Sequence, residues 1–197
     1  MLYRQWRDLD LPSPTQLYVL AEATPENNLL PQMEFHQVPH RALWRLETQP
    51  ELACYAPYLI DLGGSQAFSH WFETHMDEMA FTTLNSSLTF FPLWQHLRHF
   101  TRFADMHENR YYFLRTGNAA MLHLYVSSIT DQPHSVNRLF ADGRINGFLF
   151  QHRVTDLLMY CQPLFKNDVY EKGREEGYLL WHDLMEDFLS GGQHGPA

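Results

Sequence analysis

The stretch Tyr58-Leu59-Ile60-Asp61-Leu62-Gly63-Gly64-Ser65 joins an apolar extended run to the start of a helix. Aliphatic and aromatic residues favour a strand over 58–62, and the two glycines close it. Ser65 is a favoured helix N-cap. Large side chains then recur along one face at spacings of three and four, at Phe68, Trp71, Phe72, His75 and Met76. The pattern predicts a strand followed by a helix whose apolar face packs on the sheet.

The same alternation of strand and helix continues on both sides of this stretch. Upstream, Leu17-Tyr18-Val19-Leu20 predicts a strand, and Thr24-Pro25 can begin a short helix. Further strands are expected at 42–46 and 80–86, helices from Thr89, from Asn118 to Ile129 and from Asp131 to Gly143, and a hairpin from 101–106 and 110–115. We therefore expect an α/β chain of the mixed α+β type, in which helices flank a mixed sheet.

The last third of the chain is expected to be mainly helical. Residues 145–160 contain extended candidates but are also compatible with a helix. Gly173 and Gly177 would each cost about 1 kcal/mol inside a helix, so we expect a break there and a helix over 177–189. Its apolar stripe is interpreted as a partner-binding surface made of Tyr178, Trp181, Leu184, Met185 and Phe188. Such a stripe also suits a core helix, and both interpretations stay open at this point.

The domain division follows from these elements. Residues 1–16 carry prolines among charges and are expected to form an N-terminal tail. Residues 17–142 are the α/β domain and residues 143–189 its C-terminal extension. Residues 190–197 are rich in Gly, Pro and His and are expected to be a flexible tail.

The charge balance argues against nucleic acid as a partner. The formal net charge is −9 at pH 7, which repels a phosphate backbone. The sequence shows no run of Lys or Arg that would give a local exception. All but Lys166 and Lys172 of the 14 basic residues are Arg, a bias that favours forked and stacking contacts with protein.

The sequence also predicts a cytoplasmic protein without membrane insertion. Cys54 and Cys161 are too few for the disulfide framework of a secreted fold. The first ten residues contain no apolar core of a signal peptide. No apolar stretch approaches the roughly 20 residues that a bilayer crossing requires.

No familiar catalytic motif is found in the sequence. A glycine-rich phosphate loop, a zincin pair, a nucleophile elbow and a paired-cysteine redox motif are all missing. The pairs His96/His99 and His36/His40 have helix-compatible spacing, yet their flanks favour structural roles over a metal site. We therefore expect no enzyme activity, catalytic residue, metal or cofactor.

Two ordered motifs carry a resemblance to a known family. They are the strand Ala56-Pro57-Tyr58-Leu59, which is followed by the helix with Trp71, and the helix end His96-Leu97-Arg98, which is followed by a hairpin. Over residues 17–142 the chain resembles the adaptor, or effector-chaperone, family of bacterial type VI secretion systems (domain of unknown function 4123). In that family the hairpin leads through an Arg-aromatic-aromatic-Asp-Pro motif. Here Arg115 is a loose match, because the Asp-Pro is missing.

The resemblance implies a cytoplasmic, non-catalytic adaptor that binds a secreted effector and the VgrG spike protein and joins them before secretion. It implies no cofactor. Two other functions remain open at the level of sequence. The chain could be an immunity-type inhibitor that blocks a toxin, or an enzyme whose His and Asp residues are dispersed along the sequence.

Overall fold

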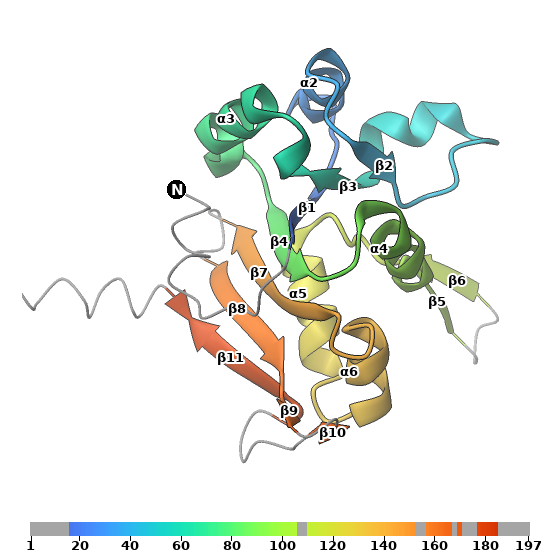
Figure 1. The fold of residues 1–197 in the computed structure, drawn as a ribbon. Coiled ribbons are helices and arrows are strands. Elements are labelled where there is room, and N and C mark those ends of the chain that lie inside the picture. The colour runs from blue at the N-terminus through green and yellow to red at the C-terminus, as the bar shows by residue number, and fades with distance from the viewer. Residues whose placement is uncertain (1–15, 106–109, 153–156, 167–168, 171–176, 185–197) are drawn as a thin grey trace, which may run out of the picture.

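A seven-stranded sheet organises the molecule (Figure 1). A computed structural model describes residues 16–105, 110–152, 157–166, 169–170 and 177–184. The strand order is β11-β8-β7-β4-β1-β3-β2. The α+β fold class is confirmed, but each neighbouring pair in this sheet is antiparallel, so its strand directions are not mixed.

The elements have the following bounds. The sheet contains β1 (Gln16–Glu22), β2 (His40–Ala42), β3 (Pro57–Asp61), β4 (Phe81–Ser86), β7 (Ile145–His152), β8 (Leu157–Pro163) and β11 (Leu179–Asp183). Two small hairpins pair β5 (Arg102–Asp105) with β6 (Arg110–Phe113) and β9 (Phe165–Lys166) with β10 (Val169–Tyr170). The helices are α2 (Leu29–Phe35), α3 (Gln66–His75), α4 (Phe90–Leu97), α5 (Ala119–Ser128) and α6 (Pro133–Leu139). Short 3-10 turns occur at Pro50–Tyr55, Leu62–Gly64, Met76–Glu78 and Arg98–Phe100.

Strand β1 is buried on both of its faces. Tyr18 and Leu20 belong to one core, and Val19 and Ala21, which alternate with them, belong to the other. An unbroken apolar run is what a strand with two covered faces requires. β1 pairs with β3 on one side and with β4 on the other, so it also lies inside the sheet.

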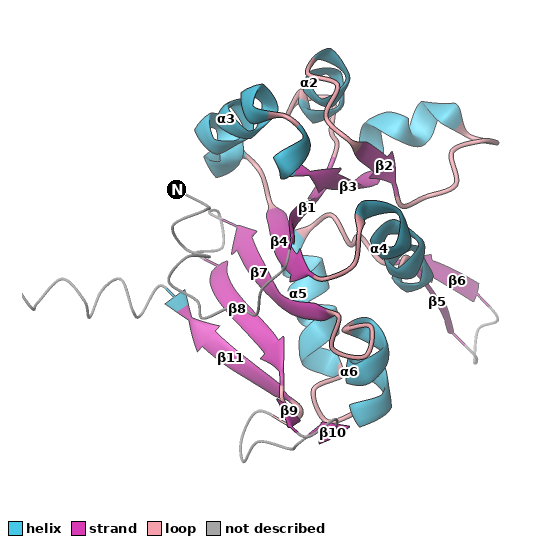
Figure 2. Ribbon diagram, viewed as in Figure 1, coloured by secondary structure: helices cyan, strands magenta, loops and turns pink. Residues whose placement is uncertain are grey.

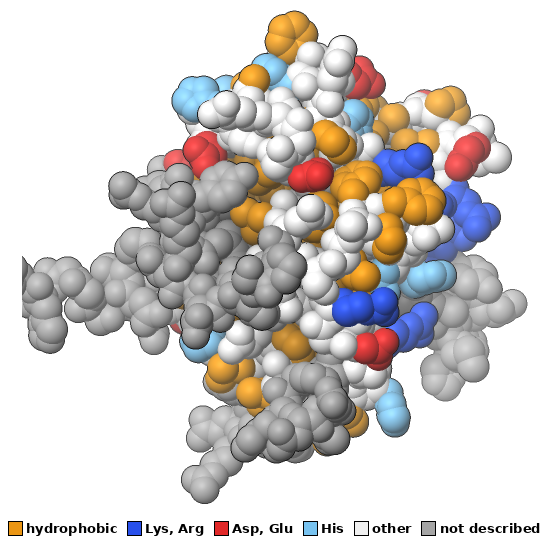
Figure 3. Space-filling model, in the orientation of Figure 1, with side chains coloured by type: hydrophobic (Ala, Val, Ile, Leu, Met, Phe, Trp, Pro, Cys, Tyr) orange, Lys and Arg blue, Asp and Glu red, His pale blue; other side chains and the backbone are white. Residues whose placement is uncertain are grey.

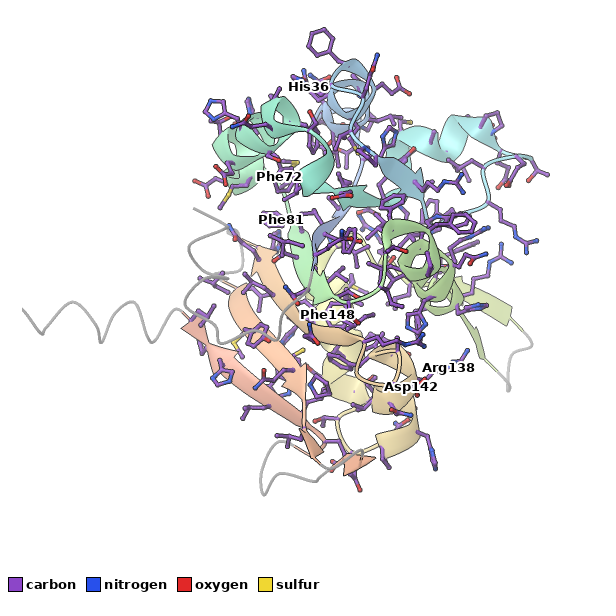
Figure 4. The ribbon with its side chains drawn as sticks, in the orientation of Figure 1. His36, Phe72, Phe81, Arg138, Asp142 and Phe148 are labelled. Carbon is purple, nitrogen blue, oxygen red and sulfur yellow. The ribbon has the colours of Figure 1, made fainter. Side chains whose placement is uncertain are left out.

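Each face of the sheet is covered by its own helices. The first core joins β1, β3 and β4 to the buried faces of α4, α5 and α6, through residues such as Leu93, Leu122 and Leu139. The second core is built around α2 and α3. There Phe72 of α3 meets Phe81 of β4 edge to face, with ring centres 5.0 Å apart (Figure 4).

Local signals in the sequence predict several helix starts correctly. The Ser65 hydroxyl accepts a hydrogen bond from the amide of Phe68 at 3.3 Å, and α3 buries Phe68 and Phe72 as expected. Asn118 caps α5 in the same way. The hairpin of β5 and β6 is also confirmed.

Two early elements differ from the prediction. The first helix begins at Leu29 and not at Thr24-Pro25, because Thr24 and Asn27 form a turn in which each side chain bonds the other's backbone amide. The strand expected over 42–46 lies at 40–42. It pairs antiparallel with Tyr58 to Ile60 of β3. Because β3 starts at Pro57, residues after 43 have no strand residue of β3 left to pair with.

The expected helical character of 143–189 is wrong for its described residues, which are mainly strands (Figure 2). β7 pairs with the free side of β4, β8 pairs with β7, and β11 pairs with β8. Phe148 and Phe150 belong to the first core, and Leu149 belongs to a separate small cluster with Leu158 and Tyr160, which is the alternation of a strand. Pairing with an existing edge therefore overrides the helical spacing in the described residues 178–184. The proposed domain boundaries stay a prediction, and most of both tails lies outside the described residues.

Among the described residues, no helix combines the length and the apolar character that a membrane span needs.

Gly177 allows the backbone conformation that leads into β11. Its φ is +64°, and a Cβ there would lie 2.3 Å from the carbonyl oxygen of Thr130. The same carbonyl accepts a hydrogen bond from the amide of Tyr178 at 2.8 Å. Glycine is thus required both for the left-handed backbone and for the close approach.

We expect Gly177→Ala to destabilise the protein more than Gly143→Ala. Gly143 also has a positive φ of +81°, but a Cβ there would have open space around it. The left-handed conformation costs each alanine about 1–2 kcal/mol. The clash with Thr130 should add about 1–3 kcal/mol at position 177 only. Urea unfolding of both variants measures the difference, and equal losses would contradict the steric role of Gly177.

Candidate functional site

One hollow among the described residues is lined by arginines and aromatic rings. It has a volume of about 380 Å³ and lies between the segment after β2, the helix α4 and the hairpin of β5 and β6. We call it the arginine groove and define it by Trp44, Arg45, Trp94, Arg98, Arg102 and Phe113. Basic and hydrophobic side chains lie next to each other over α4 and β2 in Figure 3.

Trp94 is fixed at one side of the groove, and two arginines lie over its ring. Its indole N–H donates a hydrogen bond to the carbonyl of Ala42 at 2.8 Å, which ties α4 to the end of β2. The guanidinium carbons of Arg41 and Arg98 lie 4.7 and 4.6 Å from its ring centre. Each such cation–π contact is worth about 0.5–1 kcal/mol at an exposed site. The ring therefore holds two positive charges close together.

A second stack lies across the groove. Arg102 is placed over the ring of Phe113 at 5.1 Å, and Phe113 packs against Trp44 with ring centres 5.6 Å apart. Phe113 is nevertheless 55% exposed. The indole N–H of Trp44 is buried and has no acceptor among the described residues. The second wall is thus apolar, accessible and positively charged at its rim.

The groove is strongly cationic. Arg45, Arg98 and Arg102 also line an adjoining hollow, where Glu47 is the acidic neighbour. Within the described part of the chain, Arg41, Arg45, Arg98 and Arg102 form no ion pair. Arg115 and Arg144, by contrast, pair with Glu22 and Asp142. Among the described residues, the groove and the neighbouring Arg41 therefore concentrate positive charge, with Glu47 as an acidic neighbour, on a chain of net charge −9.

This concentration of charge corrects the expectation that the chain has no cluster of basic residues. The four arginines are spread over residues 41–102, so no window of the sequence shows them together. The fold brings them to one surface. One local signal is the spacing of Trp94 in α4 and Arg98 at its C-cap, which are four residues apart and in contact.

The first family motif is structural. Ala56, Pro57, Tyr58 and Leu59 are all buried at the start of β3. The Tyr58 hydroxyl donates to the carbonyl of Ala53 at 3.0 Å, and burial raises its pKa to about 12. These residues hold the sheet together and lie away from the groove.

The three residues of the second family motif have different roles. The Nε2 of His96 lies 3.0 Å from the carbonyl oxygen of Leu139 and donates to it, which joins α4 to the end of α6. Burial lowers the pKa of His96, which favours the neutral ring. Leu97 is buried in the first core. Of the three, only Arg98 reaches the groove.

Trp71 and Arg115 lie elsewhere. Trp71 stacks on His75 along α3, with ring centres 4.8 Å apart. Arg115 forms a two-pronged ion pair with Glu22, in which its Nε donates to Oε1 at 2.9 Å. The pair ties the segment after β6 to the end of β1. The structure therefore does not bring the family-motif residues together into one site.

The described part of the expected C-terminal surface packs inward. Trp181 lies beside His123 and Phe150, with ring centres 5.1 and 6.0 Å away. Tyr178 and Leu184 are half-buried and also pack against core clusters. Met185 and Phe188 lie outside the described residues. A partner-binding role for this segment stays a prediction.

The histidine pairs do not form a recognisable metal site. His40 Nδ1 bonds the carbonyl of Val38 at 2.8 Å, and His36 lies against Phe35 and Phe68 at the end of α2 (Figure 4). Across the described residues, no three His, Cys, Asp or Glu side chains are grouped as metal ligands.

The His123→Phe variant should have a flatter dependence of stability on pH. Burial lowers the pKa of His123 below its ordinary value of about 6.5. Below that pH the unfolded chain binds the proton more readily, so the native state loses stability as the pH falls. Phenylalanine keeps the ring packing but cannot titrate. Urea unfolding at pH 7.5 and pH 5 measures both slopes, and an unchanged slope would contradict the desolvation of His123.

The comparison with known proteins gives one result. A family model described as Domain of unknown function (DUF4123) matches residues 17–135, which is more than half of the chain. The match runs from β1 into α6 and includes all six residues that define the groove. No curated protein and no solved structure gives a significant match. The chain belongs to the DUF4123 family.

Proposed function

We propose that this protein is a non-catalytic cytoplasmic adaptor that binds a type VI secretion effector and helps to load it onto the VgrG spike protein. The observation that carries the proposal is the arginine groove. Its surface combines the exposed ring of Phe113 and two half-buried tryptophans with guanidinium groups that form no ion pair among the described residues. The DUF4123 membership and the resemblance of the two ordered motifs are consistent with this function.

The chemistry of the groove suits protein recognition. Trp and Arg are enriched among the residues that dominate binding energy at protein interfaces. Stacking on Trp94 limits the motion of Arg41 and Arg98, so less side-chain entropy is lost when a partner binds. The wall formed by α4 is anchored to the central sheet through the Trp94 bond to Ala42 and the packing of Leu93 and Leu97. A loader needs such a rigid and accessible surface.

Co-expression with the neighbouring gene products tests the proposal. We expect the tagged full-length chain to co-purify with the effector and the VgrG protein encoded beside it, with dissociation constants in the micromolar range or tighter, a free energy of about −8 kcal/mol. An effector and a VgrG protein from an unrelated locus serve as the matched control. A full-length chain that captures neither cognate protein would contradict the proposal.

The activity of the bound effector separates an adaptor from an immunity-type inhibitor. An adaptor should leave the effector active in the purified complex, and deletion of the gene should abolish secretion while the cells survive. An inhibitor should abolish the activity of the bound toxin, and deletion of the inhibitor gene should kill the cells. Enzyme assays on the effector, with and without the chain, and viability counts of the deletion strain measure these outcomes.

A further inference from the structure

We infer that the arginine groove binds an acidic segment of a partner protein, and that this segment carries an aromatic or aliphatic side chain beside its carboxylates. The inference rests on the proposed function and names the chemistry of the partner that the groove recognises.

Charge is the first argument. Arg41, Arg45, Arg98 and Arg102 form no ion pair within the described part of the chain, whereas Arg115 and Arg144 do. Unpaired charges of one sign that lie close together repel each other, so a carboxylate placed between them is attracted by all of them. The planar guanidinium fork matches a carboxylate with two parallel hydrogen bonds. The groove therefore favours Asp and Glu side chains.

The fixed position of the arginines is the second argument. Arg98 lies 4.6 Å from the ring centre of Trp94, and Arg102 lies 5.1 Å from that of Phe113. Trp94 is itself held by its hydrogen bond to Ala42. A guanidinium that stacks by its face keeps its N–H edge available for an acceptor. The donors are therefore oriented before the partner arrives, which lowers the entropy lost on binding.

The exposed rings indicate a protein segment. Phe113 of the groove is 55% exposed under Arg102. Phe91 does not line the groove but packs against Trp94, and it is 47% exposed under Arg41. These rings offer contact area to an apolar side chain next to the carboxylates. A long nucleic acid would extend past a groove of about 380 Å³ onto a chain of net charge −9, which would repel its phosphates. A short acidic and apolar peptide fits both the charge and the size.

The test uses overlapping 15-residue peptides that cover the neighbouring effector and VgrG sequences. We expect the peptides that bind the full-length protein to be acidic and to contain an aromatic or aliphatic residue. Affinity should fall steeply as salt is raised from 50 to 500 mM, because exposed charges are screened. A 15-nucleotide single-stranded RNA and inorganic polyphosphate are measured as competing probes.

The decisive variant is Arg45→Glu/Arg102→Glu. Both side chains are exposed, so the fold should tolerate the change. We expect at least a tenfold loss of affinity for the best peptide and for the full-length partner that contains it. Arg144→Glu reverses one arginine, half of the charge change of the double variant, and it should keep affinity within about twofold of the wild type because Arg144 does not line the groove. Circular dichroism and urea midpoints confirm that each variant is folded.

The outcomes separate the inference from the proposed function. If the wild type captures its partners and the double variant binds them equally well, the groove inference is overturned and the adaptor function stands. If the best peptides are basic, or if RNA or polyphosphate binds more tightly than any acidic peptide, the inference is also overturned. If the wild type captures neither cognate partner, the adaptor function itself fails.

Discussion

The burial of β1 on both faces is the constraint on which the rest of the structure depends. Tyr18 and Leu20 must be covered on one side and Val19 and Ala21 on the other, so helices are needed on both faces of the sheet. β3 and β4 pair with the two edges of β1. β2 is attached to β3, and α4 follows β4 along the chain. The neighbours of a single strand therefore position α4, which forms one wall of the arginine groove, and the segment after β2, which carries Trp44.

The groove uses a chemical property that Arg has and Lys lacks, which gives the excess of Arg over Lys a role in this protein. A lysine ammonium is compact and strongly hydrated, whereas a guanidinium can stack on a ring and still donate through its edge. Arg41 and Arg98 on Trp94, and Arg102 on Phe113, use this property. An acidic protein can thus maintain one local surface of opposite sign. The contrast between this surface and the net charge of −9 favours a small anionic group over an extended polyanion.

Most of the residues that carry the family resemblance maintain the scaffold. Ala56 to Leu59 build β3, His96 joins α4 to α6, and Arg115 ties the segment after β6 to β1. Arg98 is the motif residue that reaches the groove. The surface proposed for recognition thus lies on side chains near the ends of elements, while the motif keeps those elements in position.

The sequence by itself determined the elements whose signals are local. The caps at Ser65 and Asn118, the apolar runs of β1 and β3, and the hairpin of β5 and β6 depend on residues a few positions apart, so a short window contains the full cause. Only the tertiary structure decided that the last third forms β7, β8 and β11, because the edge of β4 supplies the hydrogen-bond partner that makes a strand more favourable than a helix. The arginine groove was likewise decided by the fold. Its residues span positions 44–113, and their proximity arises from strand pairing and helix packing over distances that no local pattern encodes.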